Sequence, residues 1–128
     1  MTGAQRVVGR GWATVEMDRA NAELSHLVGW GGFDPVERSA LLGARCRRAR
    51  ALDTTEGEWI VLLEPDTEGR LAAFLARHGE GWAATWEDAA DGELAGSRRG
   101  PLGPETLRPD QPVSGPFRLR AVAATIEP

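Results

Sequence analysis

The side chains that most often carry catalysis or bind metals are few in this chain. It has two histidines, His26 and His78, and a single cysteine, Cys46. Both histidines fall near the ends of predicted helices, where an imidazole more often meets solvent or the helix dipole than a metal ion. One cysteine permits neither an intramolecular disulfide nor a cysteine metal cluster, so we expect Cys46 to pack as a small apolar group.

Carboxylates and arginines offer a second kind of chemistry. Glu64 ends an apolar segment and Glu80 lies in a predicted turn. Either could act as a base if burial raised its pKa, although a solvated surface position is the reading we favour. Four arginines share one predicted strand: Arg45, Arg47, Arg48 and Arg50. Because a guanidinium binds a carboxylate through two hydrogen bonds, some of them could hold an anionic ligand group, while the others would form salt bridges or lie exposed.

Tryptophan is the most unusual component of the sequence. There are five tryptophans, at positions 12, 30, 59, 82 and 86, against three phenylalanines and no tyrosine. Since strand side chains alternate between faces, Trp82, Ala84 and Trp86 are expected to share one face. The same alternation places Trp59 with Val61. These indoles either line a pocket or fill the core. If they line a pocket, offset stacking between rings would favour a planar ligand.

The elements that position these residues are of both kinds. β-Branched residues, apolar runs and turn residues predict strands over 5–16, 39–52, 57–65, 81–86 and 115–128, and a weak strand or turn over 33–39. Apolar residues at helical spacing predict helices over 17–28 and 66–79, the second with Asp66 as N-cap and Gly79 as its stop. Residues 87–95 are expected to form one or two helical turns, and 96–115 loops joining short edge strands. Phe117 is expected on the inward face of the last strand.

Composition excludes several classes of protein. The chain has 128 residues, a net charge of -4 and a pI near 5.2, with arginine as its only basic residue besides histidine. A protein that binds nucleic acid usually presents a basic face, so we expect no such partner. No apolar run reaches the length of a membrane span or a signal peptide, so we expect a single cytoplasmic domain over 1–128 without a membrane partner.

Two stretches resemble the vicinal oxygen chelate superfamily, which includes glyoxalase and bleomycin-resistance proteins. ATVEMDRANAEL (13–24) is similar to the end of its first strand and the start of its first helix. IVLLEPDTEGRLAAFLARHGEGW (60–82) is similar to the fourth strand and inter-module link of methylmalonyl-CoA epimerase-like members. The later SGPFRL (114–119) resembles a late element less specifically.

This resemblance implies an α+β fold of paired βαβββ modules that form a cupped, mostly antiparallel sheet, commonly completed in a homodimer. The modules would span about 5–66 and 80–128, with a helical link over 67–79. Metal-dependent members carry ligands on strands of the cup, and the aligned motifs place Gly9, Val61 and Ala84 at three such positions. None of these side chains can coordinate a cation, so we expect neither a metal nor another cofactor.

The leading functional hypothesis is therefore a metal-free protein that sequesters a planar or aromatic natural product, as antibiotic-resistance members of the superfamily do. The expected ligand-binding residues face the cup: Trp59, Val61, Trp82, Ala84, Trp86 and Phe117. Trp12 alternates with Gly9 and Gly11 and is expected on the opposite side of the sheet. The alternative is a metal-independent isomerase, cyclase or lyase in the same cavity, for which the sequence names no catalytic residue; a structural domain with a tryptophan-filled core is the third possibility.

Overall fold

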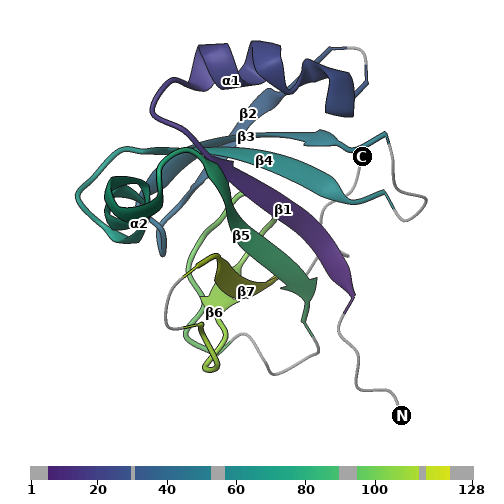
Figure 1. Cartoon of the computed structure of the whole chain (residues 1–128). Coiled ribbons are helices and arrows are strands. Elements are labelled where there is room, and N and C mark those ends of the chain that lie inside the picture. The colour runs from purple at the N-terminus through teal and green to yellow at the C-terminus, as the bar shows by residue number, and fades with distance from the viewer. Residues whose placement is uncertain (1–5, 30, 53–56, 90–94, 113–114, 122–128) are drawn as a thin grey trace.

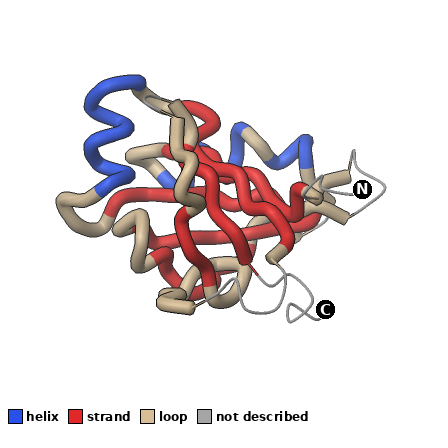
Figure 2. Tube along the Cα trace, turned by 90° about the horizontal axis from the view of Figure 1, so that it is seen from below, coloured by secondary structure: helices blue, strands red, loops and turns tan. Residues whose placement is uncertain are grey.

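Seven strands form one curved sheet in the computed structural model, which describes residues 6–29, 31–52, 57–89, 95–112 and 115–121. The elements in chain order are β1 (Val7–Ala13), α1 (Met17–Glu23), the 3₁₀ turn η1 (Ser25–Leu27), β2 (Asp34–Ser39), β3 (Ala44–Arg50), β4 (Trp59–Pro65), α2 (Arg70–His78), β5 (Gly81–Asp88), β6 (Glu105–Leu107) and β7 (Phe117–Ala121). The strand order is β2-β3-β4-β1-β5-β7-β6. Figure 1 shows α1 above the sheet and α2 at one end of it, and Figure 2 shows the strands from below, with one helix at the side of the sheet.

The two halves of the sheet repeat one pattern of pairing. β1 pairs in parallel with β4, and β5 pairs in parallel with β7. In each half the next neighbour outward is antiparallel, and β1 joins β5 antiparallel at the centre. The predicted α+β class and mostly antiparallel cupped sheet are confirmed. The helical turns predicted over 87–95 are wrong at their start, because β5 continues to Asp88, and residues 90–94 of that range lie outside the described residues.

The convex face of the first half is covered by α1. Met17 and Ala20 of α1 are buried against Ile60 and Leu62, which alternate with the inward side chains of β4. Trp12 packs against the same cluster, which confirms its predicted place on this side of the sheet. Burial of this apolar stripe is what holds so short a helix, because an isolated helix of this length is unstable in water.

The concave face carries the larger core. Val61 and Leu63 of β4 and Trp86 of β5 meet Leu71 and Phe74 of α2 there. The alternation of β4 between the two clusters explains why its sequence reads as one continuous apolar run, since both of its faces are buried. α2 therefore closes one end of the cup.

Two predicted boundaries were wrong. α2 begins at Arg70 after Gly69, rather than at Asp66 as N-cap. Asp66 instead forms an ion pair with Arg38, which lowers the pKa of its carboxyl. Gly79 does end α2, with a φ of 78° that residues with a side chain rarely adopt. β3 begins at Ala44 because residues 40–43 form a turn.

Candidate functional site

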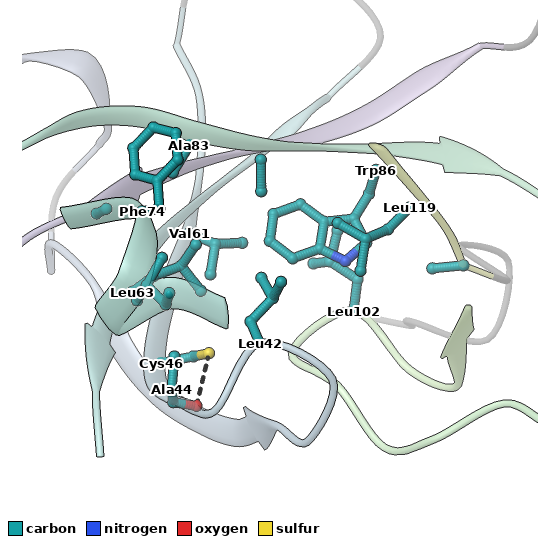
Figure 3. Close-up of a cluster of buried hydrophobic side chains, with 14 of the residues drawn as sticks. Leu42, Ala44, Cys46, Val61, Leu63, Phe74, Ala83, Trp86, Leu102 and Leu119 are labelled. Atoms are coloured by element: carbon teal, nitrogen blue, oxygen red, sulfur yellow. Dashed lines mark hydrogen bonds between the residues drawn. The ribbon is translucent and has the colours of Figure 1, made fainter. Parts of the chain in front are cut away.

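The interior of the cup is filled by side chains of the chain itself. Leu42 from the turn before β3 and Leu102 from the loop before β6 are both fully buried, and they point toward the indole of Trp86 (Figure 3). A Cβ added to Gly9 would lie 2.6 Å from Leu102 Cδ1, and one added to Gly11 would lie 2.9 Å from Trp86 Cζ3. The absence of side chains at these glycines is therefore what lets Leu102 and Trp86 fit.

The three positions aligned with metal ligands lie together on this concave face. Gly11 of β1 pairs with both Val61 and Ala84, and Gly9 precedes it by two residues on the same face. Val61 and Ala84 are buried among apolar neighbours, with no oxygen or nitrogen donor in their side chains. Within the described residues no group of three or more His, Cys, Asp or Glu side chains is arranged to hold a metal ion. The residues at these positions do not fit a divalent cation.

Among the described residues, the carboxyl inside the cup belongs to Glu105, at the start of β6. It is fully buried, and it accepts hydrogen bonds from Ser39 Oγ at 2.7 Å and from Trp86 Nε1 at 2.8 Å. Burial raises the pKa of Glu105 to about 7, although both hydrogen bonds oppose the rise. A Cβ on Gly100 would lie 2.1 Å from Glu105 Oε1, so the loop before β6 seals this carboxyl from solvent.

Trp59 lies on the concave face of β4, as predicted, but its ring is already in contact with two cations. The guanidinium carbon of Arg48 lies 4.3 Å from the centroid of the indole and that of Arg50 lies 4.0 Å away. A planar ligand that stacked on Trp59 would have to displace at least one of these contacts. Trp86 also faces inward as predicted, but it is fully buried and bonded to Glu105.

Trp82 does not face the cup, which corrects the expected face for this residue. The β1–β5 ladder has an irregularity between Gly11 and Trp12, and Ala83 and Ala84 are both buried on the inner side. A β-bulge of this kind breaks strict alternation. Trp82 instead packs edge-on against Trp12, with 5.1 Å between ring centroids, and it is 38% exposed.

An open groove lies at the end of the cup beside α2. Its floor is formed by Phe74, Phe117 and Leu107, and the rings of the two phenylalanines are 5.9 Å apart. The other residues that line it are Arg70, Ala73, Arg77, His78, Gln111, Pro112 and Gly115. Its volume of about 350 Å³ is within the range of small-molecule sites. Of the predicted ligand-binding residues, Phe117 alone lines it.

The groove combines an apolar floor with positive charge on one wall. Arg70, Arg77 and His78 all come from α2, and no Asp or Glu is among the described residues that line the groove. Arg70 donates to the carbonyl of Leu41 at 3.0 Å. Gln111 is occupied with the backbone of residues 108 and 118, which fixes the opposite wall. The chemistry of the groove suits an anion with an apolar or planar body.

The larger hollow by the first turn of α1 has a different character. It measures about 630 Å³, but its charges neutralise one another: Arg45 pairs with Glu64, and Arg47 with Asp18 at 2.9 Å. Glu64 also accepts the backbone N–H of Met17 at 3.0 Å and so holds the start of α1. These carboxylates are structural anchors.

The remaining sequence candidates have structural partners as well. Glu80 accepts Trp12 Nε1 at 3.0 Å and pairs with Arg19 at 2.6 Å, so it fastens α1 to the start of β5. Burial raises the pKa of the Cys46 thiol, which makes it a poor nucleophile and agrees with the apolar role expected for it. The ring of His78 lies 4.6 Å from that of Phe74, beside the groove.

Comparison with solved structures places this architecture among known folds. Methylmalonyl-CoA epimerase from Streptomyces coelicolor in complex with 2-nitronate-propionyl-CoA superposes with a TM-score of 0.73 at 22% identity, over 97% of this chain and 98% of that one. A methylmalonyl-CoA epimerase in complex with methylmalonyl-CoA and NH4+ gives 0.70 at 23% identity, over 96% and 97%. The Mycobacterium tuberculosis epimerase gives 0.69 at 18% identity, over 94% and 90%. The chain has the vicinal oxygen chelate fold.

No protein-family model and no curated protein matches this chain. The residues of the chain itself therefore define how it differs from a metal-binding cup. Sequence reasoning identified the positions that lack donors, Gly9, Val61 and Ala84, and the inward faces of Trp59 and Trp86. It missed Leu102, which lies within a Gly- and Pro-rich segment without periodicity, and Glu105, which directly follows that segment. The signal that the sequence offers for Glu105 is its place directly before Thr106 and Leu107, a segment too short to show the alternation of a strand.

No helix in the described part of the chain is long and apolar enough to cross a membrane.

Proposed function

We propose that this chain is a binding protein for a small anionic molecule with an apolar or planar body, held in the groove between α2 and β7. The observation that carries the proposal is the pairing of the phenylalanine floor with Arg70 and Arg77 in an open cavity whose described lining contains no carboxylate. The epimerase folds, two of them in complex with CoA thioesters, support a small organic ligand of this general kind.

The structure argues against the centre of the cup as the site. A ligand there would have to displace Leu42 and Leu102, which are both fully buried. Displacing a buried leucine costs on the order of 2–3 kcal/mol in lost burial before any ligand contact forms. The groove requires no such rearrangement, because Phe117 and Leu107 are only partly buried and already line an open cavity.

Binding can be measured with 8-anilinonaphthalene-1-sulfonate, a planar anion whose emission rises in apolar sites. We expect a saturable rise with the wild-type protein and weaker binding with Arg77→Gln or Phe117→Ala. Arg47→Gln removes the same charge on the convex face of β3 and serves as the matched control. Equal affinity in all four proteins would remove the groove from the proposal.

A metal-independent isomerase is the second candidate, and the epimerase neighbours lie closer to it than to antibiotic sequestration. The observation in its favour is Glu105, a buried carboxyl whose pKa of about 7 suits proton transfer; a substrate would reach it only after the loop before β6 moved away from it. Methylmalonyl-CoA incubated with the protein in deuterium oxide tests it by mass spectrometry. A binding protein returns the thioester without enzyme-dependent deuterium; exchange that is lost in Glu105→Gln would establish the isomerase.

Three further expectations belong with this proposal. The aromatic nature of the ligand follows from the phenylalanine floor and is tested by comparing planar with aliphatic carboxylates. A homodimer is expected from the resemblance, and light scattering of the purified protein measures its mass. A cytoplasmic location is expected from the sequence and is tested by cell fractionation.

A further inference from the structure

A second cationic feature lies at the end of the cup away from α2. Arg50 pairs with Trp59 across the β3–β4 ladder, and Arg48 precedes it by two residues on the same face. Both guanidinium carbons lie within 4.3 Å of the centroid of the Trp59 ring. One indole therefore holds two positive charges in fixed positions, because the face of an aromatic ring attracts a cation that lies above it.

These two charges are not neutralised within the described part of the chain. Arg48 Nη1 donates to the carbonyl of Pro101 at 2.8 Å, and Arg50 Nη1 donates to the carbonyl of Gly57. Neither arginine has a carboxylate oxygen within ion-pair distance among these residues. Burial, and then the charge of Arg50, lower the pKa of Arg48, so keeping Arg48 charged at this position costs free energy.

The opposite face of the same strand makes the contrast. Arg45 and Arg47 alternate with Arg48 and Arg50 along β3, and they point to the convex side. Arg45 pairs with Glu64, and Arg47 pairs with Asp18 at 2.9 Å. The strand thus has one face with compensated arginines and one face whose arginines bond only to neutral carbonyls.

We propose that Arg48 and Arg50 form an oxyanion-binding site, distinct from the groove beside α2, with Trp59 as the platform that orients both guanidiniums. Its ligand is a phosphate or carboxylate group. Each guanidinium has several N–H donors, and the one carbonyl that each is shown to bond leaves donors for an oxyanion. Such a ligand would offset the repulsion between the two cations.

The test is titration with inorganic phosphate and, separately, with acetate, at an ionic strength held constant with sodium chloride. Tryptophan emission and the melting temperature Tm are followed together. We expect a saturable change in wild type, with affinity reduced on the order of tenfold or more in Arg48→Gln/Arg50→Gln. Arg45→Gln/Arg47→Gln makes the same change in charge on the other face and is expected to respond like wild type.

Two further variants secure the assignment. Arg50→Gln changes an exposed side chain and keeps the test available if the double variant is unfolded by circular dichroism. Trp59→Phe is expected to lose the change in emission but retain a rise in Tm, which would place the responding indole at this site. Saturation by phosphate alone identifies a phosphate group as the ligand, and saturation by acetate alone a carboxylate. No saturable response in wild type, or an unchanged response in Arg50→Gln and the double variant, overturns the proposal.

Discussion

The interior of the cup and the groove beside α2 are parts of one apolar core, but they differ in what covers them. Leu42 and Leu102 close the interior over Gly9 and Trp86, and the loop before β6 seals Glu105 beneath it. At the other end Phe74 and Phe117 belong to the same core and yet line an open cavity. The fold can therefore lose its central cavity and keep a concave surface at the end of the sheet.

The largest effect that tests this comparison is expected for Leu102→Ala. Removing a fully buried leucine side chain that packs on Gly9 should lower the free energy of unfolding by about 2–5 kcal/mol. Urea denaturation measures the change. Leu52→Ala, at a position 66% exposed, is the control and should shift it by less than about 0.5 kcal/mol. A Leu102 variant as stable as this control would mean that the interior is open.

Glu105→Gln should alter how stability depends on pH. The pKa of Glu105 in the folded protein, about 7, lies above its ordinary value of 4.5, so folding favours the protonated form. This contribution is fully present below about pH 4.5 and is lost as pH rises through 7, by about 3 kcal/mol in all. Glutamine does not titrate, so the variant should gain on wild type between pH 4.5 and 8. A difference in unfolding free energy that is constant over this range would contradict a sealed carboxyl.

Arg77→Gln should change ligand binding without changing the core. Arg77 lines the groove and forms no ion pair or side-chain hydrogen bond with the other described residues. Loss of one charge-assisted hydrogen bond should weaken the binding of 8-anilinonaphthalene-1-sulfonate about tenfold. Fluorescence titration measures the affinity, and urea denaturation should show an unchanged free energy of unfolding. An affinity equal to that of Arg47→Gln would remove Arg77 from the site.

The smallest effect is expected for Trp82→Ala. The substitution removes the edge-on contact between Trp82 and Trp12. It also removes the contact with the guanidinium carbon of Arg10, which lies 4.9 Å from the centroid of the Trp82 ring. We expect a loss of about 1 kcal/mol in stability and no change in ligand affinity. A marked loss of affinity would restore Trp82 to the binding site that simple alternation predicted.

These cases show how far sequence reasoning reaches. The continuous apolar run of β4 and the glycine after α2 predicted real elements, because apolar burial and backbone conformation are local constraints. The face of Trp82 was predicted wrongly because a bulge beside Gly11 inserts one residue into the alternation. Which arginines of β3 face the cup follows from its register with β4, which alternation alone does not provide.

The site shows the same division. The lack of metal donors at Gly9, Val61 and Ala84 was visible in the sequence, because the identity of a single residue decides whether its side chain can bind a metal. The closure of the cup was not visible, since Leu102 reaches Gly9 from a loop with no periodic pattern. The groove brings α2 together with the segment around Phe117, and that contact depends on tertiary structure.

The most direct test of the account is a nuclear magnetic resonance titration of isotope-labelled protein with 8-anilinonaphthalene-1-sulfonate. The indole N–H of Trp86, bonded to Glu105, reports on the interior, and the amides of Arg77 and Phe117 report on the groove. We predict that the amide signals of Arg77 and Phe117 shift and saturate together while the Trp86 indole signal stays in place. A saturating shift of the Trp86 indole, with the Arg77 and Phe117 amides unmoved, would contradict the account and return the ligand to the centre of the cup.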